Sequence, residues 1–99
     1  MRRWILPRND GEAVEIERFL LARGETVLVS HQPWGASWQG LESSIRNQIP
    51  DGAAVYGIEL GGQPTIGGAV NIDHHRYRDE DRWRPDSSLE QVAARLGVV

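Results

Sequence analysis

The stretch that decides the fold runs over residues 4–30 and reads WILPRNDGEAVEIERFLLARGETVLVS. It begins with an apolar run closed by a proline, which predicts a short buried strand at Trp4–Leu6. Apolar side chains then recur at three- and four-residue spacing over 13–23, the pattern of an amphipathic helix, and Gly24 ends it. A β-branched, apolar run at 26–30 predicts a second strand. Strand, helix and strand in this order predict a right-handed crossover and a parallel sheet.

The remaining chain continues the alternation of helices and strands. We predict a helix over 38–48, strands over 53–60 and 69–72, and a last helix opened by Ser87 and Ser88. A glycine-rich connection, Gly61–Gly68, joins the last two strands. The sequence therefore predicts one α/β domain over residues 1–99, an open, mostly parallel sheet of about four strands with helices on both faces.

The composition excludes several classes of function. The chain of 99 residues has a formal net charge of −3, which argues against broad nucleic-acid binding because such binding needs a basic face. There is no cysteine, so disulfides, thiolate nucleophiles and cysteine-ligated zinc are excluded. No run reaches the roughly 18 apolar residues of a membrane span, and the apolar start is too short for a secretion signal. We expect a cytoplasmic protein that does not contact a membrane.

An acid and two imidazoles follow the last predicted strand, as Asp73, His74 and His75. The carboxyl ends of parallel strands are where open α/β sheets bind their ligands. Imidazole and carboxylate together suit Mn²⁺, Zn²⁺ or Fe²⁺ better than Ca²⁺. The triplet is therefore a candidate metal site, and the alternative is an exposed polar strand end that binds nothing.

The run Asn71–His75 at the end of a strand resembles the signature motif of the DHH phosphoesterase superfamily. That family includes RecJ-like exonucleases, oligoribonuclease and cyclic-dinucleotide phosphodiesterases, with family II pyrophosphatases as relatives. Weaker matches occur in the family's order along the chain. The turn Arg8–Gly11 lies where the family has Asp-x-Asp-Gly, and Glu59 lies where it has an acid after a central strand. The segment Ser87–Gln91 is similar to the family's serine-opened helix.

The resemblance implies metal-dependent hydrolysis of a phosphodiester or phosphoanhydride at a two-metal site, usually occupied by Mn²⁺. Carried over by position, Asp10, Glu59 and His74 are the implied metal ligands. His75 is the implied phosphate contact, and Asp73 the residue that orients a histidine. The implied partner is a phosphorylated small molecule or a nucleotide. Asp10 has a simpler interpretation as a helix cap.

The sequence also departs from the family's pattern. Arg8 replaces the first acid of the first motif, which removes a carboxylate from one metal. Glu59 replaces an aspartate, and its additional methylene shifts the carboxylate. The family's fourth acidic motif and its second domain have no counterpart before the chain ends. We therefore expect residues 1–99 to correspond to the front, N-terminal portion of a DHH-type catalytic domain.

Several other features have two interpretations each. His31 follows the second predicted strand, so it could reach the same edge or lie on its rim. The arginine-rich segment 76–84, with interleaved aromatic residues, could hold phosphate and stack a base, or form a solvated, salt-bridged loop. Trp34 and Trp38 fit packing or an interface better than a ligand cradle. The connection Gly61–Gly68 matches neither common phosphate-binding motif.

Two functions are consistent with these patterns. The first is a DHH-like phosphoesterase domain whose activity is reduced by the missing acid. The second is a catalytically silent α/β interaction module that binds a protein partner or another copy of itself through exposed tryptophans and sheet edges. Because the front half of a catalytic domain would leave apolar edges of its sheet uncovered, we expect a homo-oligomer.

Overall fold

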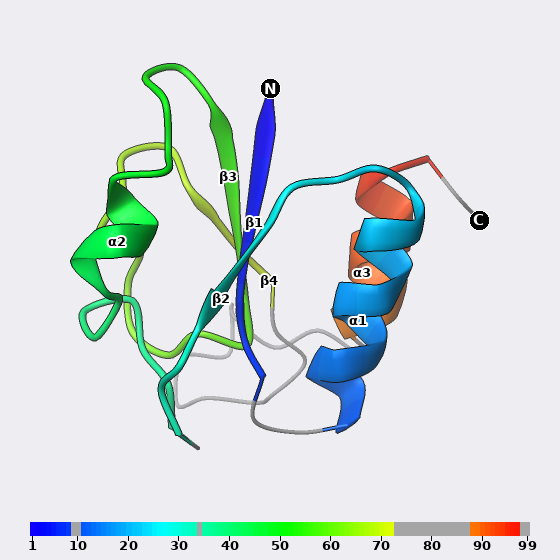
Figure 1. Ribbon diagram of the computed structural model, residues 1–99, viewed down its shortest axis with the longest axis horizontal. Coiled ribbons are helices and arrows are strands. Elements are labelled where there is room, and N and C mark those ends of the chain that lie inside the picture. The colour runs from blue at the N-terminus through cyan, green and yellow to red at the C-terminus, as the bar shows by residue number, and fades with distance from the viewer. Residues whose placement is uncertain (9–10, 34, 73–87, 98–99) are drawn as a thin grey trace.

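The computed structural model describes residues 1–8, 11–33, 35–72 and 88–97 (Figure 1). Strands and helices occur in the order β1 (Arg2–Pro7), α1 (Gly11–Ala22), β2 (Val27–Ser30), α2 (Ser43–Arg46), β3 (Ala54–Ile58), β4 (Val70–Ile72) and α3 (Ser88–Arg95). No helix among these residues is long and apolar enough to span a bilayer.

The strands form one sheet in the order β2-β1-β3-β4, and every pairing is parallel. Trp4 of β1 lies beside Val27 of β2 and Tyr56 of β3, which sets the register at the centre of the sheet. The predicted fold class is therefore confirmed: this is an open α/β sheet of four parallel strands.

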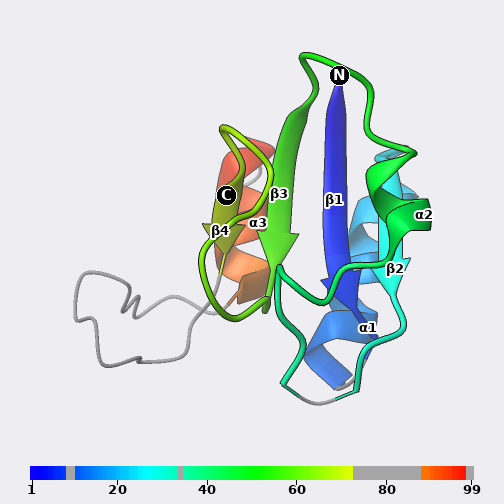
Figure 2. The same ribbon diagram turned by 90° about the vertical axis from the view of Figure 1, so that its left-hand side faces the viewer.

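Helices cover both faces of the sheet. Helices α1 and α3 lie side by side on one face, and α2 lies on the other (Figures 1 and 2). Successive side chains of a strand point to opposite faces, so β1 contributes to two cores. Trp4 and Leu6 are fully buried in the core beneath α1 and α3, whereas Ile5 is fully buried in the core on the α2 face.

The helix predicted over 13–23 is present as α1. Its stripe is buried as expected: Ala13, Ile16 and Leu20 are fully buried, and Phe19 packs against the same core. Gly24 ends the helix with φ of 75°, the left-handed conformation that glycine adopts at low cost.

The helix predicted over 38–48 is wrong. Only Ser43–Arg46 is helical, because Trp38 is held in place by the chain that follows β3. The Trp38 amide donates to the Gly61 carbonyl across 3.1 Å, and the Gly61 amide donates to the Ala36 carbonyl across 2.9 Å. The Trp38 ring is fully buried. It is therefore a packing residue, and the expectation that it is exposed for an interface is wrong, while Trp34 lies outside the described residues.

Helix α3 carries the predicted apolar stripe. Val92 of this helix is fully buried, and Leu89 and Leu96 pack against the same core. The predicted capping serine, Ser87, lies outside the described residues. The next residue, Ser88, begins the helix and is fully buried.

Candidate functional site at the carboxyl edge of the sheet

The carboxyl ends of all four strands lie at one edge of the sheet (Figure 2). Arg8 follows β1, His31 follows β2 and Glu59 follows β3. The chain leaves β1 toward α1, but it leaves β3 toward the opposite face, where Leu60 is buried in the α2-side core. In open α/β sheets, the usual ligand-binding position is at the carboxyl edge, between adjacent strands whose connections diverge in this way.

Glu59 marks this point with an unusual backbone. It is the one non-glycine residue with positive φ, 56°, in the part of the chain that the structure describes. Ile58 is fully buried in the core beneath α1 and α3, and Leu60 is fully buried in the core on the α2 face. In a regular strand these two side chains would share a face. The left-handed turn at Glu59 therefore carries the chain across the sheet, at a cost of about 1 kcal/mol.

Hydrogen bonds tie Glu59 to two other elements. Its amide donates to the carbonyl oxygen of Ile72, at the end of β4, across 2.9 Å. Its carboxylate oxygen Oε1 accepts a hydrogen bond from Ser88 Oγ, at the start of α3, across 2.6 Å. The ends of β3 and β4 and the start of α3 therefore meet at one residue, Glu59.

Glu59 is the predicted site residue that the structure describes. Asp10, Asp73, His74 and His75 lie outside the described residues. Ile72, which immediately precedes the triplet in the sequence, is the residue whose carbonyl binds the Glu59 amide. Within the described ranges, no three histidine, aspartate or glutamate side chains are grouped so that they could hold a metal ion. The described part of the predicted metal centre is thus one residue, Glu59, whose amide is bonded to β4 and whose carboxylate is bonded to α3.

Arg8 stands where the implied motif has its first acid, and its guanidinium is bonded to Glu17 of α1. Its Nε donates to Glu17 Oε1 across 2.9 Å, and its Nη2 to Glu17 Oε2 across 2.5 Å. These hydrogen bonds, together with the negative charge of Glu17, raise the pKa of Arg8 above its usual value. The guanidinium charge is therefore matched by a carboxylate of α1, which reduces its repulsion of a cation at the sheet edge.

His31 lies on the rim of this edge and its side chain is exposed. Its backbone amide donates to Glu42 Oε2 across 3.0 Å, and the buried Ser30 hydroxyl donates to Glu42 Oε1 across 2.7 Å. The amide hydrogen bond first, and then the hydroxyl, lower the pKa of Glu42. Since β1 lies between β2 and β3, His31 is separated from Glu59 by a whole strand.

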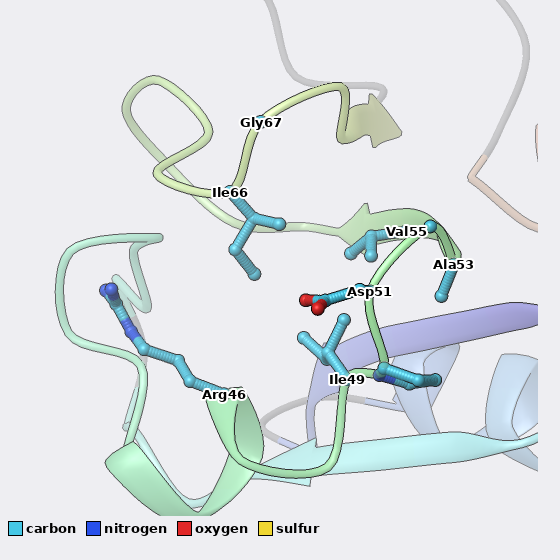
Figure 3. Close-up of a pocket in the computed structure, with 9 residues that line it drawn as sticks. Arg46, Ile49, Asp51, Ala53, Val55, Ile66 and Gly67 are labelled. Atoms are coloured by element: carbon cyan, nitrogen blue, oxygen red, sulfur yellow. The ribbon is translucent and has the colours of Figure 1, made fainter.

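A hollow at the other end of the sheet is not part of this site. It has a volume of about 380 Å³ and lies between the turn that precedes β3 and the β3–β4 connection (Figure 3). Arg46 and Asp51 lie at its rim, and Ile49, Val55 and Ile66 are among its apolar lining residues. Val55 is near the start of β3, whereas Glu59 follows the end of the same strand.

Two residues of the carboxyl edge were not predicted from the sequence. The sequence predicts only a helix start at Ser88 and predicts no role for Glu42. The signal in each case is weak, since Ser88 is separated from Glu59 by 29 positions and Glu42 from Ser30 by 12. Neither spacing reflects a local motif.

Comparison with known proteins gives no match: no protein family, curated protein or solved structure is similar to the chain at a significant level.

Proposed function

We propose that this chain is a DHH-like phosphoesterase domain that hydrolyses a phosphodiester or phosphoanhydride with divalent metal ions. The observation that carries the proposal is Glu59. Its carboxylate lies at the carboxyl edge, where adjacent strands diverge, and its amide is bonded to the residue that precedes the Asp73-His74-His75 triplet. A left-handed glutamate between two buried side chains is the kind of local strain that functional sites retain.

The proposed roles follow from residue chemistry. Glu59, Asp10 and His74 are the proposed metal ligands, with Mn²⁺ the proposed ion because it accepts both carboxylate and imidazole. His75 contacts the phosphoryl group, and Asp73 orients a histidine. When bound, divalent cations supply a water of lowered pKa and offset the charge that develops on the phosphoryl group.

The substrate class is a phosphorylated small molecule or a nucleotide. A chain with a net charge of −3 lacks the basic surface for broad nucleic-acid binding, which favours small substrates. The absence of cysteine fits a reducing, cytoplasmic location. Because Arg8 supplies no carboxylate, we expect weaker metal binding and slower turnover than a complete set of acids would give.

One observation favours a second function, a catalytically silent interaction module that binds a protein partner or another copy of itself. Arg8 stands where a metal carboxylate is expected, and both of its bonded nitrogens are directed to Glu17. The first motif has thus exchanged a ligand for an ion pair that connects β1 to α1. Leu21, at 55% exposure, offers an apolar contact on the outer side of α1.

A hydrolysis assay separates the two functions. Bis(p-nitrophenyl) phosphate and pyrophosphate are incubated with the purified chain and Mn²⁺, and the His74→Ala variant is compared with His31→Ala. His31 provides the matched control because it is an exposed imidazole on the rim of the same edge. We expect slow Mn²⁺-dependent turnover that His74→Ala abolishes and His31→Ala leaves unchanged. If the wild type hydrolyses neither substrate, the result would favour the interaction module.

A further inference from the structure

The hollow at the amino end of the sheet has an apolar floor (Figure 3). Val55 is 3% exposed, and Ile49 and Ile66 are half-buried against the same core on the α2 face. The volume of about 380 Å³ lies near the lower end of the range for small-molecule sites, which is roughly 300 to 1,000 Å³. The hollow is lined by residues within 46–67, all of which the structure describes, and its size suits a small ligand.

Two tight turns frame the hollow. The amide of Ala53 donates to the Pro50 carbonyl across 3.2 Å, and the amide of Ala69 donates to the Ile66 carbonyl across 3.1 Å. Because backbone hydrogen bonds close both turns, the hollow is formed before a ligand arrives. A preformed site lowers the entropic cost of binding.

Arg46, the last residue of α2, lines one side of the hollow. Its Nη2 donates to Thr65 Oγ1, in the β3–β4 connection, across 3.3 Å. A guanidinium has five N–H donors, so this contact leaves donors for a carboxylate in the hollow. Among the residues that the structure describes, no carboxylate forms an ion pair with Arg46.

Asp51 supplies the opposite charge. Its carboxylate points into the hollow, between Ile49 and Ile66, while the Arg46 side chain extends along the other side (Figure 3). Asp51 forms no ion pair with any described residue, Arg46 included. A cation and an anion thus border one apolar floor without pairing with each other.

We propose that the hollow binds an α-amino acid with a bulky apolar side chain, such as leucine, as a zwitterion. The ammonium group lies against Asp51, the carboxylate lies against Arg46, and the side chain covers the apolar floor. An α-amino acid carries both charges and an apolar group on one carbon, which matches these three features of the hollow. A phosphorylated ligand fits less well, because the Asp51 carboxylate would repel it. The inference is independent of the proposed function, since Glu59 follows the opposite end of β3.

The test is a titration of the chain with leucine, followed through amide resonances in the NMR spectrum. We expect leucine to shift the amide resonances of the lining residues. Three analogues each lack one feature: isocaproate lacks the ammonium group, isoamylamine lacks the carboxylate, and glycine lacks the apolar side chain. Each analogue is expected to bind at least about 3-fold more weakly than leucine.

Two variants test the charges. Asp51→Asn and Arg46→Gln are each expected to weaken leucine binding by about 3- to 10-fold. Glu15→Gln and Arg18→Gln, at exposed positions of α1 on the other face, are the matched controls and should bind leucine as the wild type does. All four substitutions change exposed side chains, so we expect the variants to fold.

Three results of the titration overturn the inference. The lining resonances do not move at millimolar leucine, any of the three analogues binds as tightly as leucine, or either folded variant at Asp51 or Arg46 keeps the wild-type affinity. Shifts of the same resonances on dilution of the protein alone would also overturn it, because they would assign the hollow to contacts between copies of the chain.

Discussion

The amide of Glu59 donates to the carbonyl oxygen of Ile72 across 2.9 Å, so the pairing of β3 with β4 extends one residue beyond the end of β3. The donor has left-handed φ, and the residue after the acceptor begins the Asp73-His74-His75 triplet. The residue with the unusual backbone is thus bonded to the strand that leads into the polar triplet. This relationship is the observation that supports the proposal of a site at the carboxyl edge.

The backbone of Glu59 should show its strain in a comparison of two truncations. Glu59→Gly and Glu59→Ala both lose the hydrogen bond from Ser88, but only glycine accepts φ of 56° without a steric penalty. We expect Glu59→Gly to be more stable than Glu59→Ala by about 1 kcal/mol in urea unfolding. Equal stability of the two variants would mean that the left-handed conformation stores no strain.

The close approach of β3 to Trp38 should make Gly57 intolerant of a side chain. A Cβ at Gly57 would lie 2.1 Å from Cζ2 of the buried Trp38 ring, whose Nε1 donates to Asn71 across 3.1 Å. We expect Gly57→Ala to lower the free energy of unfolding by about 1–3 kcal/mol, as overpacked cores do. Urea unfolding of the purified variant provides the measurement.

The matched double variant tests the cause of that loss. Trp38→Leu removes the ring that the new methyl group would meet, so Gly57→Ala should cost less in the Trp38→Leu background than in the wild type. Additive losses would show that the cost at Gly57 comes from its backbone and not from the ring.

Glu42 should give the protein an acid-dependent loss of stability. Its carboxylate accepts hydrogen bonds from the His31 amide and the Ser30 hydroxyl, and these lower its pKa in the folded state. The stabilisation is therefore present at pH values above the ordinary glutamate pKa and is lost as the pH falls through the lowered folded-state pKa. The expected contribution is about 1 kcal/mol or less, because the group is close to solvent.

A pair of glutamine substitutions isolates this contribution. Unfolding is followed between pH 7 and pH 3 for the wild type, Glu42→Gln and Glu15→Gln, the last an exposed glutamate of α1. Glu42→Gln should flatten the fall in stability at acid pH, and Glu15→Gln should reproduce the wild-type profile. Identical profiles for all three proteins would contradict the assignment.

The sequence was informative where the pattern is local. Strand, helix and strand over residues 4–30 follow from apolar periodicity and a stop glycine, and the structure has β1, α1 and β2 there. The helix over 38–48 failed because apolar residues at helical spacing, Trp38 among them, are used for long-range packing. The Trp38 amide binds Gly61, and its ring covers Gly57.

The position of Glu59 was predictable from the sequence, but its conformation and its hydrogen-bond partner were not. Glu59 after the third strand could be predicted as an acid at the carboxyl edge, because parallel strands share that edge. Its left-handed backbone and its partner Ser88 could not, since both depend on packing between elements that are distant along the chain. Ile58 and Leu60 alternate normally in the sequence, yet they are buried in cores on opposite faces.

The central claim is that the Glu59 carboxylate belongs to a divalent metal site. The most direct measurement is the dissociation constant for Mn²⁺ of the wild type, Glu59→Gln and Glu15→Gln, determined by titration calorimetry at one pH and salt concentration. We expect measurable binding by the wild type and by Glu15→Gln, and binding at least about 10-fold weaker by Glu59→Gln. Equal affinities of the wild type and a folded Glu59→Gln, or no binding by the folded wild type, would contradict it.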